Sequence, residues 1–175
     1  TLSGFTMMAY IANSSYVLQV MKGMRPIPFS LFFASTALSQ VMLSILNARL
    51  IGRYRPRALI SVGLSASVLA VAALTVGVLL LDTPLVLTCA GFLVLMASQA
   101  FIFGNSGALG AMQATHVAGS AAAVQGVVGA LAMATSAPLA SSGGGETAVP
   151  MIAVMLVGVV GSVTSFLVLA RPKSR

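Results

Sequence analysis

Polar side chains recur at helical spacing within long apolar segments of this sequence, and these are the residues with chemistry to offer. One phenol and five amides form the centre of the pattern: Tyr10, Asn13, Gln40, Gln99, Asn105 and Gln125. In an apolar segment such a group needs a partner on another helix, a substrate or water. The usual role is a structural hydrogen bond between helices, and the alternative is contact with a substrate. We treat the six residues as candidates to line a binding cavity.

Residues suited to catalysis or metal binding are scarce and widely separated. The carboxylates are Asp82 and Glu146, and the chain has a single histidine, His116, and a single cysteine, Cys89. Such spacing predicts neither a set of metal ligands nor an acid–base pair. The glycine-containing segment 104–107 lacks the strand, lysine and spacing of a phosphate-binding loop. We expect no catalytic residue, no metal and no cofactor, and we expect that the protein is not an enzyme.

The composition is that of an integral membrane protein. Of the 175 residues, 58% are apolar and 6% are charged, and the mean hydropathy is +1.05. Soluble domains carry about 25% charged residues, and disordered chains have low hydrophobicity. The net charge of +7 would suggest nucleic acid as the partner of a soluble protein. Here the cations lie in short breaks between apolar segments, so we expect the chain to be embedded in a lipid bilayer and to have no nucleic-acid partner.

The hydrophilic breaks divide the chain into apolar segments that are each long enough to cross a membrane. A spanning helix needs about 20 apolar residues, and the sequence lacks the alternating polarity of membrane β-strands. We therefore expect an all-α membrane protein in which residues 1–175 form one bundle. Its six expected transmembrane helices cover residues 2–21, 29–48, 58–81, 85–112, 118–140 and 149–170.

The basic residues predict the orientation, because alternate breaks must lie on the same side of the membrane. One side carries seven cations: Arg49, Arg53, Arg55, Arg57, Arg171, Lys173 and Arg175. The other side carries two, Lys22 and Arg25. Since cytoplasmic loops are enriched in Lys and Arg, we expect the basic loop 49–57 and both ends of the chain to be cytoplasmic.

Polar faces occur in the first, second, fourth and fifth segments, whereas the third and sixth carry only scattered Ser and Thr. This distribution is expected of two three-helix repeats around a central cavity, with the third and sixth helices at the periphery. In the fifth segment, Gln125 is surrounded by Gly119, Ala122, Gly126 and Gly129. Small residues on one face let another backbone approach closely, which predicts helix packing at this stripe.

Several segments resemble one family of transporters. They are, in chain order, residues 10–19, 29–34, 47–50, 56–59, 104–109, 116–122 and 150–151. The first four look like the seventh and eighth helices and the following loop of Bcr/CflA-type drug-resistance transporters, which belong to the major facilitator superfamily. The last three are similar to that family's tenth helix, the junction into the eleventh, and the start of the twelfth. The resemblance extends over essentially the whole chain.

The resemblance implies a proton-coupled multidrug efflux protein with twelve helices in the inner or plasma membrane, of which this chain is the C-terminal six. It implies that the proton gradient supplies the energy and that the six-helix N-terminal half is the partner. The family's proton-carrying carboxylate lies in that half, and no acidic residue falls within an apolar segment here. Two departures both remove a helix-kinking Pro: the segment 13–15 stands where Gly-Ser-Pro is usual, and Gly104 precedes Asn105 where Pro is common.

We therefore predict the C-terminal bundle of a major facilitator superfamily fold, built as two inverted three-helix repeats and working by alternating access. The six candidate residues would form hydrogen bonds and aromatic contacts with an amphipathic drug. The sequence starts at Thr1 within an apolar run, and we expect that it begins partway through a larger protein. The alternatives are a self-contained six-helix protein that homodimerises as a channel or small carrier, and a membrane scaffold that transports nothing.

Overall fold

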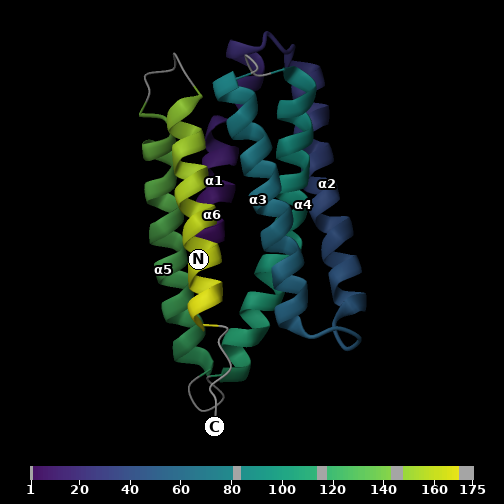
Figure 1. Ribbon diagram of the computed structural model, residues 1–175, viewed down its shortest axis with the longest axis vertical. Helices are drawn as coiled ribbons and strands as arrows, with labels where there is room; N and C mark the ends of the chain where they lie inside the picture. Colours follow the sequence, from purple (N-terminus) through teal and green to yellow (C-terminus); the bar gives the residue numbers. More distant parts are fainter. Residues whose placement is uncertain (1, 81–83, 114–117, 143–147, 170–175) are drawn as a thin grey trace.

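The computed structural model describes residues 2–80, 84–113, 118–142 and 148–169 (Figure 1). Six α-helices and one π-helix follow in the order α1 (Leu2–Ser15), η1 (Tyr16–Met21), α2 (Pro26–Leu50), α3 (Pro56–Leu80), α4 (Leu85–Gln113), α5 (Ala118–Ala140) and α6 (Val149–Leu169). The predicted all-α fold is confirmed for these residues, in which the only β-type pairing is an isolated bridge between Ile51 and Tyr54. The expectations that concern Asp82, His116, Glu146 and residues 171–175 fall outside them.

Proline and glycine set the ends of the helices around the two described turns. Helices α2 and α3 each begin with a proline, at Pro26 and Pro56, because the first helical position needs no backbone N–H donor. The turns before them contain Gly23 at φ 66° and Gly52 at φ 103°, a backbone conformation that other residues adopt only with strain. The chain therefore reverses direction sharply after η1 and after α2.

The first apolar segment changes its helical geometry near its end, which the sequence pattern does not predict. Helix α1 passes directly into the π-helix η1 at Tyr16. The segment closes with a hydrogen bond of 2.9 Å from the Met24 backbone N–H to the Leu18 carbonyl oxygen. Such wider turns are rare and occur mostly as single turns within α-helices.

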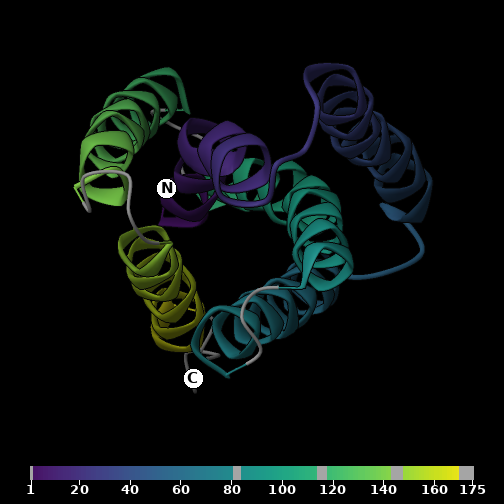
Figure 2. The same ribbon diagram turned by 90° about the horizontal axis from the view of Figure 1, so that it is seen from above.

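The helices pack as two groups of three. Each group combines the first helix of one half of the chain with the second and third helices of the other half. Helix α1 packs mainly against α5 and α6, whereas α4 packs mainly against α2 and α3. Viewed from above, α1 and α4 lie side by side in the middle, α2 and α5 lie at opposite outer positions, and α3 meets α6 (Figure 2). The first helix of each half of the chain thus packs with the second and third helices of the other half.

The core is built mainly from buried side chains of α1, η1, α3, α4 and α6. Its largest fully buried side chains include Tyr10, Leu18, Phe92 and Met155. The Tyr10 ring centroid lies 4.7 Å from that of Phe92 and 6.0 Å from that of Phe33, within the range of favourable aromatic pairs. One aromatic residue of α1 therefore joins α4 and α2.

Glycines let two pairs of helices, α1 with α6 and α3 with α4, approach closely. A Cβ added at Gly158 of α6 would meet the Thr6 Oγ1 atom, the Thr6 backbone nitrogen at 3.0 Å and the Leu2 carbonyl oxygen at 3.1 Å. A Cβ at Gly63 of α3 would lie 3.0 Å from the Ser98 carbonyl oxygen of α4, and one at Gly91 would overlap Leu74. Three of these neighbours are backbone atoms, which cannot move aside as a flexible side chain would.

Five described helices, α2 to α6, are long and apolar enough to cross a membrane, so the architecture is compatible with a multi-pass membrane protein. Their coverage by the rest of the chain differs widely. Within the apolar window of each helix, 56% of residues are buried in α4, 39% in α3 and 33% in α6, but only 6% in α2 and 6% in α5. In the described chain the outermost helices are therefore α2 and α5, rather than α3 and α6 as we expected. The difference arises because no described helix covers the outer sides of α2 and α5.

The close contact of α6 with α1 predicts a position-specific effect of adding one methyl group. Gly158→Ala should lower the free energy of unfolding by about 1–3 kcal/mol, because the new Cβ overpacks against the α1 backbone. Gly129→Ala is the matched control, since a Cβ there meets nothing within 4 Å, and it should be neutral or stabilise by up to about 1 kcal/mol through helix propensity. Thermal unfolding of both variants in detergent measures the difference, and equal melting temperatures would show that α1 and α6 do not pack in this way.

Candidate functional site

A hydrogen bond between Ser3 and Gln99 joins α1 to α4. The Ser3 hydroxyl donates to the Gln99 Oε1 atom at 2.5 Å, and the Gln99 side chain is fully buried. The Gln99 Nε2 atom has no partner among the described residues. Gln99 thus uses only its amide oxygen to hold two helices together.

Tyr10 makes the corresponding link between α1 and α2. Its hydroxyl lies 3.1 Å from the Thr36 Oγ1 atom, and both side chains are almost completely buried, at 0% and 1% exposed. The Thr36 hydroxyl lies 2.8 Å from the Phe33 carbonyl oxygen, to which it donates while Tyr10 donates to Thr36. The phenol therefore satisfies its polar end inside the bundle.

An asparagine pair joins α2 to α4 near the C-terminal end of α2. The Asn105 Nδ2 atom donates to the Asn47 Oδ1 atom at 2.7 Å and to the Phe101 carbonyl oxygen at 2.8 Å. Asn47 is 3% exposed and Asn105 is fully buried. A Cβ added at Gly104 would lie 2.9 Å from the Asn47 Nδ2 atom, so the glycine before Asn105 gives Asn47 its space. Asn105 keeps one buried oxygen, Oδ1, without a partner in the described structure.

The other three candidates have different surroundings. Asn13 is buried, and its Nδ2 atom donates to the Ala9 carbonyl oxygen of its own helix at 3.3 Å. Gln40 is half-buried on α2, and Gln125 is exposed on α5. The structure therefore does not bring the six predicted residues into one cavity. It links Tyr10, Gln99 and Asn105 to partners on other helices.

Sequence reasoning did not select the partners of these residues as candidates. Ser3, Thr36 and Asn47 stand at helical spacing from Tyr10 and Gln40 on the polar faces of the first two segments, so the pattern contained a signal for them. Which residue meets which depends on how the helices are rotated against one another. Helical periodicity within one segment does not contain that information.

The small-residue stripe of α5 contacts nothing in the described chain. A Cβ added at Gly119, Gly126 or Gly129 would meet no atom within 4 Å. Farther along the same face of α5, the helix is held to α1, where the Ser136 hydroxyl donates to the Phe5 carbonyl oxygen at 2.6 Å. The predicted close packing of this stripe therefore has no partner helix within the described residues.

The described cations lie at the two ends of the bundle. Arg49, at the end of α2, shares one end with Arg53, Arg55 and Arg57 in the following turn and the start of α3, whereas the turn that contains Lys22 and Arg25 lies at the other end (Figure 1). Helix α2, with 25 residues, separates the two turns. One end of the described bundle is therefore strongly basic.

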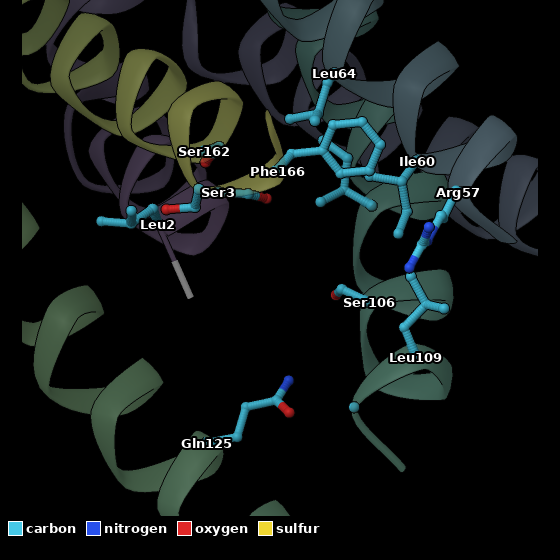
Figure 3. A pocket seen from close by; sticks show the side chains of 13 residues that line it. Leu2, Ser3, Arg57, Ile60, Leu64, Ser106, Leu109, Gln125, Ser162 and Phe166 are labelled. Carbon is cyan, nitrogen blue, oxygen red and sulfur yellow. The ribbon is translucent and has the colours of Figure 1, made fainter. Parts of the chain in front are cut away.

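A cavity of about 400 Å³ opens at this basic end. It is lined by residues from five helices: Leu2, Ser3, Arg57, Ile60, Leu64, Ile102, Ser106, Leu109, Gly110, Gln125, Ser162, Ser165 and Phe166. Arg57 and Ser106 lie on one side and Gln125 lies across from them (Figure 3). The Gln125 Oε1 atom would lie 3.0 Å from a Cβ added at Gly110, so this side chain reaches from α5 to α4. Of the six candidate residues, Gln125 is the one that lines this cavity.

The described residues include no group of three His, Cys, Asp or Glu side chains that could hold a metal ion. The site therefore offers hydrogen-bonding groups, aromatic rings and the guanidinium of Arg57. Comparison with protein-family models, with curated proteins and with solved structures finds no match to this chain.

The asparagine pair predicts a measurable coupling between α2 and α4. Hydrogen bonds between membrane helices contribute about 0.6 kcal/mol on average and up to about 1.7 kcal/mol. In a double-mutant cycle of Asn47→Ala and Asn105→Ala, we expect a coupling energy of about 0.5–1.5 kcal/mol in unfolding free energy. Ser35→Ala is the control partner, because the Ser35 hydroxyl donates to the Phe32 carbonyl oxygen of its own helix. Strict additivity of the two asparagine variants would contradict the pairing.

Proposed function

We propose that this chain is the C-terminal six-helix half of a major facilitator superfamily transporter that exports drugs in exchange for protons by alternating access. In this proposal, drug binds between this bundle and a six-helix N-terminal half, and the two halves rock about the shared site. The resemblance to Bcr/CflA-type transporters names the family. The proposal places the basic end of the bundle in the cytoplasm, in agreement with the distribution of Lys and Arg.

The observation that carries the proposal is the open small-residue stripe of α5. Gly126 and Gly129 lie in helical register on a membrane-length helix, and nothing in the described chain fills the space before them. Stripes of this kind serve to bring two membrane helices into close contact. The equally uncovered helix α2 supports the same interpretation, since a partner of six helices could cover both.

The candidate residues then divide by position. Gln40 is on one of the two least covered helices, and we assign it a direct hydrogen bond to the drug, whereas Gln125 lines the cavity inside the bundle. Tyr10, Gln99 and Asn105 hold α1, α2 and α4 together, and we assign them the positioning of the helices that face the partner half. Asn13 lies beside them on α1. Loosely specific contacts of this kind, with few charges, suit amphipathic drugs of varied shape.

A bulky residue on the α5 stripe tests this proposal. In the full-length transporter, Gly126→Leu should abolish or strongly reduce drug resistance at unchanged protein level, because the leucine prevents close approach of the other half. Ala153→Leu, at an exposed position on α6, is the matched control and should leave resistance unchanged. Resistance to several unrelated drugs, normalised to protein abundance, is the measurement.

The Gly126→Leu variant, made in the full-length transporter and in residues 1–175 alone, also separates the proposal from its alternatives. Expressed alone, residues 1–175 should insert into the membrane and confer no resistance. The same chain with Gly126→Leu should behave in the same way. Normal resistance of the full-length Gly126→Leu transporter would contradict the proposal. Transport by the purified 175 residues that Gly126→Leu abolishes would instead establish the homodimeric carrier.

A further inference from the structure

We infer that the cavity at the basic end of the bundle binds an amphipathic anion, with its charged headgroup at Arg57 and its apolar chain against the wall formed by α3, α4 and α6. The inference does not depend on the proposed transport. The cavity lies inside this bundle, between α1, α3, α4, α5 and α6, and α2 contributes no residue to it. It is therefore distinct from a drug site between two halves of a transporter.

The cavity has the size of a small-molecule site. Its volume of about 400 Å³ falls within the range of roughly 300–1,000 Å³ that is typical of ligand pockets. Such pockets are mostly apolar, with a few polar groups that converge on the ligand. The lining here combines six large apolar side chains with one guanidinium, one amide and four small hydroxyls.

The polar side of the cavity suits an oxyanion. Arg57 presents its guanidinium from the first turn of α3 (Figure 3), and a guanidinium can donate two parallel hydrogen bonds to a carboxylate or phosphate. The N-terminus of a helix adds a partial positive charge at the same place. The Gln125 amide faces Arg57 across the cavity, so that a headgroup between them can receive hydrogen bonds from both sides.

Two serine hydroxyls can contribute further hydrogen bonds. The Ser106 hydroxyl donates to the Phe103 carbonyl oxygen at 3.2 Å, and the Ser162 hydroxyl donates to the Gly158 carbonyl oxygen at 2.7 Å. Both carbonyl groups belong to the helix that carries the serine, where they can accept the regular helical hydrogen bond as well. Each hydroxyl can therefore rotate toward a ligand without leaving its carbonyl oxygen unsatisfied.

The charge of the surroundings selects an anion over a cation. The described residues include no Asp or Glu, and Arg49, Arg53 and Arg55 share the end of the bundle at which the cavity opens. A cationic ligand would meet positive charge both in the cavity and around it. An anion gains attraction from the whole end of the bundle.

The wall of the cavity next to Arg57 suits an aliphatic chain. Ile60, Leu64 and Ile102 form a small buried cluster against which Leu109 and Phe166 pack, and all five line the cavity. A chain laid on this wall would pack against apolar side chains, and for an anion that enters from water this burial favours binding. An inorganic anion would not use this surface, and for this reason we assign an amphipathic ligand.

The ligand chemistry has two possible sources, an anionic phospholipid of the bilayer and a free amphipathic anion. Native mass spectrometry of the purified protein can distinguish them with three probes: phosphatidylglycerol, phosphatidylcholine with the same acyl chains, and dodecyl phosphate. We expect phosphatidylglycerol or dodecyl phosphate to bind at one molecule per chain and phosphatidylcholine to bind at least about tenfold more weakly, because a net-neutral headgroup forfeits the charge-assisted contacts. Retention of phosphatidylglycerol alone identifies the bilayer as the source. Binding of dodecyl phosphate shows that a free anion can enter.

Variants locate the ligand in the cavity. Arg57→Gln should weaken anion binding by about tenfold or more, the usual consequence of losing hydrogen bonds from a charged group. Ser106→Leu fills the cavity from α4 and should weaken anion binding to a similar extent. The matched controls are Arg53→Gln, in the exposed turn, and Ser61→Leu, on an exposed face of α3, and both should bind as the unmodified protein does.

The proposal is overturned by any of three results. Equal binding of phosphatidylcholine and both anions would show that charge is not recognised. Equal weakening by Arg57→Gln and Arg53→Gln would show a general effect of surface charge. Undiminished binding to Ser106→Leu, with its melting temperature unchanged, would show that the ligand lies outside the cavity, and this arm decides the question even if Arg57→Gln fails to fold.

Discussion

A buried polar side chain in an apolar bundle needs a hydrogen-bond partner, and the partners that lie on another helix link the central helices of this protein. Three hydrogen bonds link α1, α2 and α4 pairwise: Ser3 with Gln99, Tyr10 with Thr36, and Asn47 with Asn105. An unpaired amide or hydroxyl in such surroundings is costly, so any other rotation of these helices would lose several contacts together. These three hydrogen bonds hold α1 and α4 at the centre, and the remaining helices pack around them.

The outer surface follows from the same arrangement. Because α1 and α4 take the central positions, α2 and α5 are held from one side only, and their other sides are uncovered. In the first half of α5, the glycines have open space beside them, although the same face packs against α1 farther along the helix. The glycines of α3 and α6 are already in contact with neighbouring helices. The bundle thus has a closed side, built from α3 and α6, and uncovered helices suited to receive a further set of helices.

The sequence predicts the helices well because the signals are local. Long apolar segments bounded by Pro, Gly and Arg define where each helix starts and stops, and the described helices cover the same segments. The wider turn after Ser15 and the uncovered positions of α2 and α5 depend on packing between segments, and the pattern does not contain them. The candidate residues divide for the same reason: periodicity identifies polar faces, but not that Gln99 meets Ser3. Arg57, which the sequence marked only as part of a basic loop, lines a cavity because the start of α3 lies beside α4 and α6.

The account rests most directly on the claim that another set of helices covers the α5 stripe in the working protein. Accessibility of spin labels to molecular oxygen, which dissolves in lipid, measures this in the full-length protein in bilayers, with Cys89 replaced by serine. Labels at position 130, beside Gly129, and at position 157, on the exposed side of α6, both stand on exposed faces of this chain. The account predicts low oxygen accessibility at position 130 and high accessibility at position 157. Equal, high accessibility at both positions would show that lipid covers the stripe and would contradict the account.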